Sequence, residues 1–424
     1  MKQTLTRSCL HLGVVAFAVA GVVGCQSDSP EIRQVYNPAP ANVIEADLTK
    51  SPAGSSKLDP VGNLEVVTLF QNGPMPTGVA VSDKGRLFVN FPRWRDPVEF
   101  TVAEIVNGVA QPYPSADYNK LKPGYPGETL VSVQSVVVDP TGSRLWLLDT
   151  GSINFAPRAT RGAKLIGIDL DSNKIVKEII FADDIALRTS YLNDVRFDLK
   201  RGAQGTAYIS DSSAFGENAI IVVDLATGKS LRRLHRHPST LATEKFVPVV
   251  EGKEMFARAP GKPDAYVKIG ADGIAVSADG KTVYYCALST RKWYSVDADV
   301  LADAAKSDED VAKTVKEMPA REFASDGLES DAQGRIYLTD YENNAVRRFD
   351  PKTGKFDVIA AMPSLIWPDS LSLAKDGHLY ITANQLNRQP QFHNESDQRK
   401  HPYVLFRVMT DGTPVRTPSA ATMR

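Results

Sequence analysis

The sequence predicts an all-β fold built from six copies of one unit, and three observations support this prediction. The 424-residue chain is 42% hydrophobic and 23% charged, which is the composition of a folded protein, neither disordered nor fibrous. Six segments share one pattern: a short apolar strand, a turn that contains glycine, and a second strand of apolar and aromatic residues. The turn glycines lie 57, 63, 75, 54 and 43 residues apart. Repeats of this length built from short strands are typical of β-propeller blades, so we expect a six-bladed β-propeller.

Each repeat supplies the first two strands of a blade as a hairpin. The strand pairs are expected at 77–81 and 87–89, 134–138 and 145–147, 193–197 and 207–209, 272–276 and 283–285, 326–330 and 336–338, and 369–373 and 379–381. A third strand follows, as at 165–169, and a turn such as 226–229 suits a tight hairpin into a fourth strand. Each blade is therefore expected to be a four-stranded meander. A β-sandwich with a separate domain is the alternative, but it does not explain six copies of one hairpin.

The last repeat lacks a fourth strand of its own. Its third strand, expected at 403–407, leads into a C-terminal tail at 411–424 that is rich in Thr, Pro and Ala. The apolar segment 64–69 precedes the first repeat and can take the missing place. We therefore predict a propeller over residues 63–410 whose ring is closed by this N-terminal strand.

The first 24 residues have the features of a secretion signal. Lys2 and Arg7 precede an uncharged apolar run at 12–24, which is too short to span a bilayer, since that takes roughly 18 residues. Residues 22–25, which end in Cys25, are similar to the lipobox of bacterial lipoproteins. This resemblance implies that residues 1–24 are removed as a lipoprotein signal peptide and that Cys25 is acylated. An ordinary secretory signal that is cut elsewhere is the alternative.

The lipoprotein resemblance also bears on location. Gln26 stands where retention in the inner membrane prefers aspartate, so the resemblance implies a lipid anchor in the outer membrane, with the protein facing the periplasm. Residues 25–62 are rich in Pro, Ser, Ala, Asn and Asp, lack a strand or helix period, and are expected to form a flexible tether. The N-terminal lipid is the only contact with a membrane that the sequence predicts.

Charge and cysteine content argue against several kinds of partner and site. Lys plus Arg number 49 against 50 Asp plus Glu, so no basic excess exists to neutralise a nucleic-acid backbone. Three cysteines are too few for a disulfide framework or a structural zinc site. Nucleic acid is therefore not an expected partner.

The polar residues that open the first strands define the candidate ligand site. Because the first strand of each blade lines the channel of a propeller, these residues should form a ring at one mouth: Thr77, Gln134, Asn193 with Asp194, Asp272, Asp326 and Asp369. Long loops at 92–99, 150–163, 236–271 and 383–402 are expected on the same face. Trp94 lies in one of these loops, and both packing between blades and stacking on an aromatic ligand are open to it. This arrangement predicts a covered binding site for a small-molecule ligand, either polar or aromatic. In the alternative interpretation, the polar residues only cap backbone donors and fill a wet channel.

Several of these segments resemble a known family. The matching segments are 130–139, 144–151, 191–194 with 207–212, and 272–275 with 284–289. They are similar to the signature of the yellow and major royal jelly protein family, of which this chain would be a bacterial member. The resemblance implies a six-bladed propeller. It also implies either conversion of dopachrome, as a tautomerase, or binding of biogenic amines in the channel.

A weaker resemblance, through blade topology, is to the calcium-dependent lactonases of the gluconolactonase and regucalcin type. It implies a calcium ion on Asn193, Asp272 and Asp326, with Asp194 as the catalytic residue that moves a proton. Thr77 stands where those enzymes have a glutamate, which removes one carboxylate from the pattern. Two functions therefore stay open: an enzyme, either lactonase or tautomerase, or a binding protein whose ring only holds a cationic or hydroxylated ligand.

Overall fold

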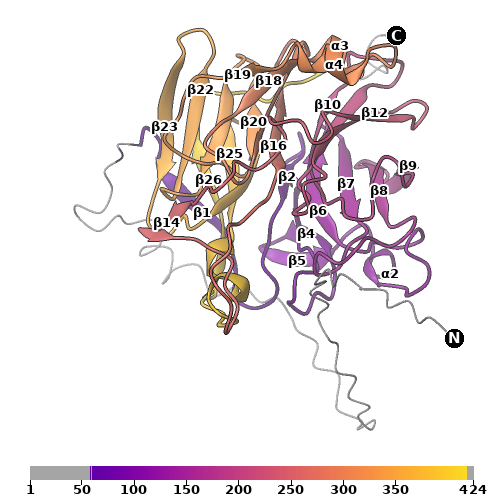
Figure 1. Ribbon diagram of the computed structural model, residues 1–424. Helices are drawn as coiled ribbons and strands as arrows, with labels where there is room; N and C mark the ends of the chain where they lie inside the picture. The colour runs from indigo at the N-terminus through magenta and orange to yellow at the C-terminus, as the bar shows by residue number, and fades with distance from the viewer. Residues whose placement is uncertain (1–57, 59, 418–424) are drawn as a thin grey trace, which may run out of the picture. The chain divides into compact units, whose positions relative to one another are not determined.

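Six four-stranded antiparallel sheets dominate the computed structural model, which describes residues 58 and 60–417 (Figure 1). Blade 1 holds β2 (Val79–Val81), β3 (Leu87–Asn90), β4 (Val102–Val106) and β5 (Val109–Pro112); blade 2 holds β6 (Val133–Val138), β7 (Arg144–Thr150), β8 (Ala163–Asp169) and β9 (Lys174–Ile180); blade 3 holds β10 (Leu192–Asp198), β11 (Thr206–Asp211), β12 (Ala219–Asp224) and β13 (Ser230–Arg233). Blade 4 holds β16 (Ala271–Val276), β17 (Thr282–Ala287), β18 (Tyr294–Asp297) and β19 (Lys316–Glu317); blade 5 holds β20 (Leu328–Ser330), β21 (Ile336–Asp340), β22 (Ala345–Asp350) and β23 (Lys355–Ala361); blade 6 holds β24 (Pro368–Leu373), β25 (His378–Ala383), β26 (Tyr403–Met409) and β1 (Leu64–Phe70).

The remaining elements are short and belong to the connections between strands. They are α2 (Ala116–Asn119), the hairpin of β14 (Val249–Val250) and β15 (Lys253–Glu254), α3 (Ala298–Ala302), α4 (Asp308–Ala312), and the 3-10 turns η1 (Leu386–Arg388) and η2 (Pro390–Phe392).

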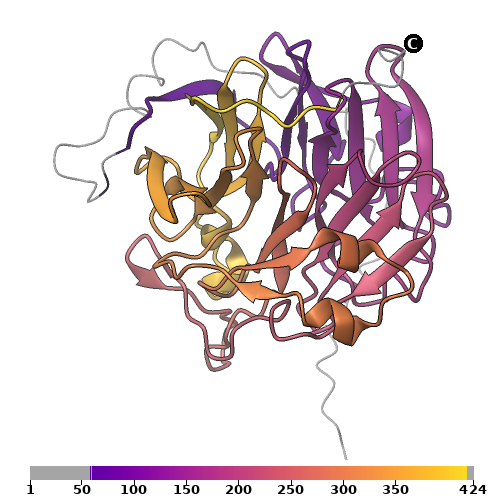
Figure 2. The same cartoon turned by 90° about the horizontal axis from the view of Figure 1, so that it is seen from above.

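The first strands of the blades form a closed ring around a common axis. The strands β2, β6, β10, β16, β20 and β24 contact one another in this order, and β24 contacts β2. Figure 2, which looks down on the ring, shows the blades following one another around its centre from indigo to yellow. The predicted six-bladed β-propeller is therefore confirmed.

The ring is closed by the strand that the sequence predicted. β1 pairs antiparallel with β26, from Leu64 opposite Val408 to Phe70 opposite Tyr403. The sixth sheet therefore combines three strands from the C-terminal end of the propeller with one from its N-terminal end. Separating this strand would expose its buried apolar side chains, at a cost of roughly 1.5 to 3 kcal/mol for each large one.

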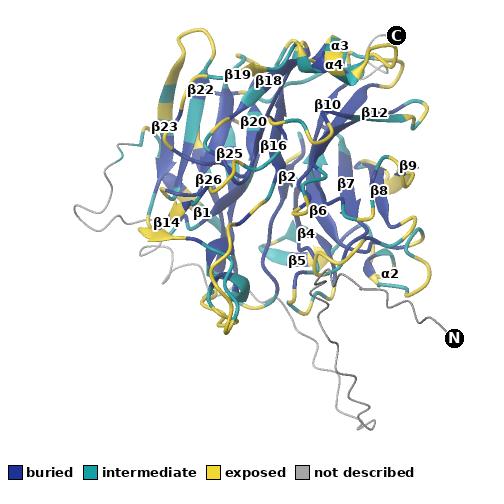
Figure 3. Cartoon of the chain, in the orientation of Figure 1, coloured by how far each residue is buried: buried dark blue, intermediate teal, exposed yellow. Residues whose placement is uncertain are grey.

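Aromatic and branched side chains fill the spaces between neighbouring blades, whose strands are largely buried (Figure 3). Trp146 of blade 2 stacks on Phe197 of blade 3 with ring centroids 5.0 Å apart, and Trp293 meets Phe349 across blades 4 and 5 at 5.0 Å. Close packing of this kind makes the strands a rigid scaffold for the loops at each end of the ring.

The N-terminal predictions fall mostly outside the described residues. The predicted signal peptide at 1–24, the acylated Cys25 and most of the tether lie there. At the end of the predicted tether, the backbone N–H groups of Val61 and Gly62 donate to carbonyls of β23 at 3.0 Å. Over the part of the chain that the structure describes, no helix has the length and apolar character needed to cross a membrane.

The C-terminal segment 411–417 covers one mouth of the channel. Pro414 forms an isolated β-bridge with Asp331 of blade 5, and the N–H of Thr417 donates to the carbonyl of Pro140 of blade 2 at 2.8 Å. In Figure 2 this yellow segment crosses the end of the ring. The small cavity beneath it holds about 70 Å³. The candidate site lies at the opposite mouth.

Candidate functional site

Local breaks in strand register carry the predicted site residues. In four first strands the pairing with the second strand shifts: between Val133 and Ser135, Leu192 and Val195, Ala271 and Ile274, and Pro368 and Leu371. These irregular segments contain Gln134, Asn193, Asp272 and Asp369. A β-bulge bends its strand and changes the direction in which a side chain points. The polar residues therefore leave the regular alternation of their strands at the channel mouth.

Two glycines bring neighbouring first strands close together. A Cβ atom on Gly273 would lie 2.1 Å from the backbone oxygen of Asp326, and one on Gly327 would lie 2.4 Å from that of Asp369. Both distances are far below van der Waals contact, so only a residue without a side chain fits at either position. Gly273 thus allows the strand that carries Asp326 to lie close to Asp272. Gly327 likewise allows the strand that carries Asp369 to lie close to Asp326.

A cavity of about 100 Å³ lies at this mouth of the channel. Five of the predicted residues line it: Gln134, Asn193, Asp272, Asp326 and Asp369. Much of the remaining wall is apolar and comes from Trp94, Phe155, Tyr191, Phe215, Leu386 and Phe392. A mainly apolar cavity with a few converging polar groups is the usual form of a small-molecule site.

Two predicted residues lie outside this lining. The hydroxyl of Thr77 donates to the backbone oxygen of Gln134 at 3.2 Å and accepts from Asn90 Nδ2 at 2.7 Å, so it joins blades 1 and 2. The Oδ1 atom of Asp194 accepts from Arg196 Nη1 at 2.7 Å, and both of these side chains are buried. Asp194 is therefore engaged with Arg196 and not with the cavity, and the catalytic role predicted for it stays a prediction.

Asp272, Asp326 and Asp369 share a buried environment, and each influences the charge of another. Burial raises the pKa of all three, and the charge of Asp326 raises those of Asp272 and Asp369 further. The pKa of Asp326 rises to about 7, although its hydrogen bond from the indole N–H of Trp367 at 2.8 Å opposes the rise. No Lys, Arg or His is among the described residues that line the cavity. The cavity therefore favours the protonated forms of these carboxyls, or a cation beside their ionised forms, over unpaired negative charge.

Amide side chains hold two of the carboxyls in position. Asn193 Nδ2 donates to Asp272 Oδ1, and Asn384 Nδ2 donates to Asp369 Oδ2 at 2.6 Å. Each of these carboxyls is thereby fixed by a neutral donor, which orients the group without neutralising its charge.

Tyr191 links the polar and the aromatic parts of the wall. Its hydroxyl donates to Gln134 Oε1 at 2.9 Å and accepts from Trp94 Nε1 at 2.6 Å. The ring of Phe155 lies against both Trp94 and Tyr191, with centroids 5.0 and 4.9 Å away. Burial raises the pKa of Tyr191 well above its ordinary value of 10.0, so the phenol stays neutral and remains a donor.

Two aromatic rings at the rim are accessible to solvent. Phe155 is 46% exposed and Phe215 is 67% exposed, although both line the cavity. Exposed rings that continue an interior apolar wall mark the place where a bound molecule would extend towards solvent. The rim therefore favours a ligand with an apolar portion.

The insertion between β25 and β26 covers the cavity from the other side. Leu386, Gln389 and Phe392 of this segment line the cavity. Arg399 forms an ion pair with Asp96 of the loop between β3 and β4 at 2.7 Å. The predicted placement of this long segment on the mouth face is thus observed, and its position is fixed by contacts between loops.

Most of the aromatic wall was not predicted from the sequence. Of the aromatic residues that line the cavity, Trp94 was predicted at the mouth, but Phe155, Tyr191, Phe215 and Phe392 were not. These four lie in connections between strands, where no periodic pattern indicates the direction of a side chain. The only available signal was the presence of aromatic residues in long loops on the mouth face.

The oxygen donors at this mouth match the preferences of calcium only in part. Carboxylate and amide oxygens are the ligands that a hard cation prefers, and Asn193, Asp272 and Asp326 supply them. Within residues 58 and 60–417, however, no group of three His, Cys, Asp or Glu side chains is arranged so that it could hold a metal ion. In addition, the nitrogen of the Asn193 amide is directed at Asp272. These residues would have to rearrange to form a calcium site, so no chemical step is assigned to a metal here.

The fold and the cavity define the class as six-bladed β-propellers with an acidic cavity at one mouth of the channel. Within this class, the family described as major royal jelly protein matches residues 131–413, and the chain belongs to that family. The resemblance predicted from the sequence is therefore confirmed.

Individual relatives are distant and longer than the matched region. Major royal jelly protein 7 of Apis mellifera is 27% identical over 190 residues, which cover 44% of this chain and 39% of the relative. A yellow-related salivary protein of Lutzomyia longipalpis is 28% identical, over 54% of this chain and 57% of the relative. Among solved structures, a calcium-binding regucalcin of Agrobacterium tumefaciens is similar, with a TM-score of 0.49 and 13% identity over 83% of this chain and 98% of that one.

Proposed function

We propose that the protein binds a small organic cation with an aromatic or apolar body at the mouth of its channel. One observation carries the proposal: three buried carboxyls line a cavity that has no basic side chain among its described residues. A cationic group is the ligand that relieves the mutual repulsion of the carboxylates.

The rest of the wall suits the body of such a ligand. Trp94, Tyr191 and Phe155 present aromatic faces, which attract both apolar rings and cations. The amides of Gln134 and Asn193 offer polar contacts between the carboxyls and the aromatic residues. This proposal develops the binding function implied by the family resemblance, and calcium-dependent lactone hydrolysis and tautomerisation are the alternatives that the sequence left open.

Binding of three matched probes tests this proposal. We expect phenethylammonium to bind at least about tenfold more tightly than the neutral 2-phenylethanol, because one charged contact contributes about 1.5 kcal/mol or more. The anionic 3-phenylpropanoate should not bind measurably. Isothermal titration calorimetry with the folded protein gives all three affinities.

The opposite ranking, or equal affinities for the cation and the alcohol, would contradict the proposal. A parallel titration with calcium, followed by lactone hydrolysis with and without chelator, tests the first alternative. Stoichiometric calcium together with chelator-sensitive turnover would replace our proposal by the lactonase.

We infer from the resemblance of residues 22–25 to a lipobox that the mature protein carries a lipid on Cys25 and is anchored in the outer membrane, facing the periplasm. Expression in a Gram-negative host with an alkyne-labelled fatty acid should label the wild type. The variant Cys25→Ser should lose the label completely, because it lacks the acylated sulfur. A labelled Cys25→Ser protein, or an unlabelled wild type, would contradict the anchor.

A further inference from the structure

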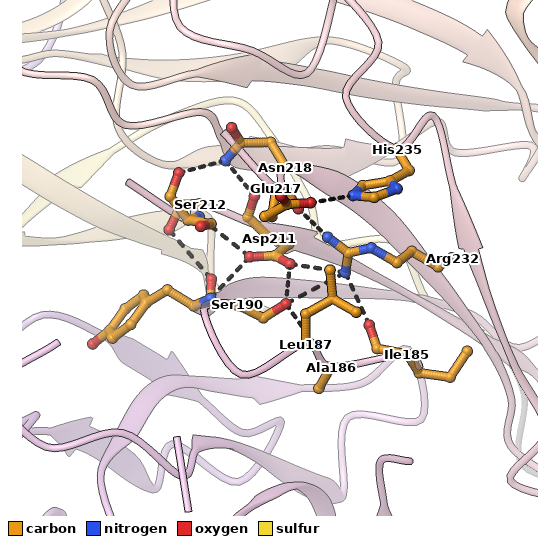
Figure 4. A network of polar contacts seen from close by, with 12 residues as sticks. Ile185, Ala186, Leu187, Ser190, Asp211, Ser212, Glu217, Asn218, Arg232 and His235 are labelled. Carbon is orange, nitrogen blue, oxygen red and sulfur yellow. Dashed lines mark hydrogen bonds and ion pairs between the residues drawn. The ribbon is translucent and has the colours of Figure 1, made fainter. Parts of the chain in front are cut away.

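A buried ion pair in blade 3 lies at the centre of a network of polar contacts (Figure 4). Asp211 is at the end of β11 and Arg232 is in β13, and the distance between Oδ2 and Nη1 is 2.8 Å. The exposed fractions of the two side chains are 0% and 8%. Neither residue lines the cavity.

Both members of the pair hold the segment that leads into the first strand of blade 3. Asp211 Oδ1 accepts from the backbone N–H of Tyr191 at 2.8 Å, and Oδ2 accepts from the hydroxyl of Ser190. Arg232 donates to the carbonyl of Ile185 at 2.9 Å and to that of Glu217. As Figure 4 shows, these bonds meet at Asp211 and Arg232. They connect the loop before β10 with the loop between β11 and β12. The backbone of Tyr191 is thus fixed by a carboxylate that has no contact with the cavity.

Tyr191 contacts three other groups of the wall. Its hydroxyl lies between Gln134 and Trp94, and it contacts Phe155 through its ring. A shift of the Tyr191 backbone would therefore move a hydrogen bond, an indole and an exposed ring at once. Displacements of a fraction of an ångström in supporting residues are enough to weaken a binding site.

The corresponding residues of two other blades show where this arrangement recurs and where it does not. In blade 2, Asp149 accepts from the N–H groups of Val131 and Ser132 at 2.7 and 2.9 Å, shortly before Gln134. In blade 5, the contacts of Asp340 with Asn343 and Arg347 stay within its own strands and turn. Asp340 thus has the same place in its blade and a similar ion pair, but it does not hold the entry to a first strand.

We propose that Asp211 is a positioning residue of the ligand site, which sets ligand affinity through Tyr191. The inference rests on the proposed function. In Asp211→Asn, one oxygen is replaced by an amide that donates. The asparagine side chain can no longer accept hydrogen bonds from Ser190, Tyr191 and Arg232 together, so the loop before β10 loses its fixed position.

The experiment compares Asp211→Asn with the matched control Asp340→Asn. Both changes break a buried ion pair, so a general loss of stability would affect both variants. We expect the affinity for phenethylammonium to fall about tenfold in the first variant, as for the loss of one well-placed contact, and to stay within about twofold of wild type in the control. Equal losses in the two variants, or no loss in either, would overturn the proposal.

A second readout works without ligand. The fluorescence of Trp94, taken as the difference between each protein and its Trp94→Phe counterpart, reports the hydrogen bond from Trp94 to Tyr191. It should change in Asp211→Asn and not in Asp340→Asn, and an unchanged signal would overturn the proposal. If wild type does not bind the probe, the proposed function fails while this signal still tests the position of Tyr191.

A milder substitution is available if Asp211→Asn does not fold. Arg232→Lys keeps the charge beside Asp211 but loses the forked contacts to the carbonyls of Ile185 and Glu217. We expect a loss of affinity in the same direction, about threefold, together with a change in the Trp94 signal. An unchanged affinity and an unchanged Trp94 signal in this variant would also overturn the proposal.

Discussion

Replacing Asp326 by asparagine is expected to remove most of the cation binding and, at pH 8, to make the folded protein more stable. Asp326 is buried in the acidic cavity, and its charge raises the pKa of both Asp272 and Asp369. The substitution takes away one full charge from the proposed ligand contact. We expect the affinity for phenethylammonium to fall at least about tenfold, since a hydrogen bond to a charged group contributes about 1.5 to 3 kcal/mol.

The gain in stability follows from the direction of the pKa shift. Burial raises the pKa of Asp326 from 3.8 to about 7, so the folded protein binds a proton more tightly than the unfolded chain does. The tighter proton binding by Asp326 stabilises the folded protein in full below about pH 4. This stabilisation is lost as the pH rises through about 7. The amide that replaces the carboxyl in Asp326→Asn cannot lose a proton and keeps an oxygen that can accept from Trp367. The free energy of unfolding at pH 8 should therefore exceed that of wild type by an amount on the order of a few kcal/mol.

Urea unfolding at about pH 5 and about pH 8 measures this difference, which should be larger at the higher pH. Asp331→Asn is the matched control, because Asp331 is also buried in blade 5 but lies at the far end of the channel, 2.6 Å from Arg335 Nε. This control should lose stability at both pH values and bind the probe normally. An Asp326→Asn protein that is less stable than wild type at pH 8 would show that a charge on Asp326 is not costly in the folded protein, and one that binds the probe as tightly would show that Asp326 does not contact the ligand.

Much of the fold was predictable because it follows from periodicity along the chain. A hairpin repeated six times fixes the number of blades, and a missing last strand requires a partner from the other end, which β1 provides. The same reasoning located Gln134, Asn193, Asp272, Asp326 and Asp369, since the first strand of every blade borders the channel.

The remaining parts of the site depend on tertiary contacts that sequence spacing does not contain. Asn193 and Asp194 are neighbours in one bulge, yet only Asn193 lines the cavity, because Asp194 pairs with Arg196. Tyr191 is placed by Asp211, which is distant from it in sequence and belongs to the next strand of the same blade. Such partners decide the direction of a side chain in a bulge or a loop. The periodicity of the sequence does not predict these partners.

Cation affinity is expected to depend strongly on pH between about 5.5 and 7. In this range Asp326, whose pKa is about 7, is mostly protonated in wild type, and burial also raises the pKa values of Asp272 and Asp369. A bound cation must replace at least one of these protons. The affinity for phenethylammonium should therefore rise about tenfold per pH unit for each proton released, and the rise should flatten once the carboxyls are ionised. The probe keeps its own charge throughout, as a lysine side chain does.

Calorimetry in two buffers of different ionisation enthalpy counts the released protons directly. The variant Asp331→Asn should keep the same pH dependence, because its change lies outside the cavity. An affinity that stays constant from about pH 5.5 to 8 would contradict the model of competing protons. In that case the carboxyls would already be ionised in the free protein, and the attraction for a cation would come from the aromatic faces of Trp94 and Tyr191, which do not titrate in this range. A pH-dependent affinity would instead place the cation at Asp272, Asp326 and Asp369, because these are the described carboxyls of the cavity whose pKa values are raised by burial.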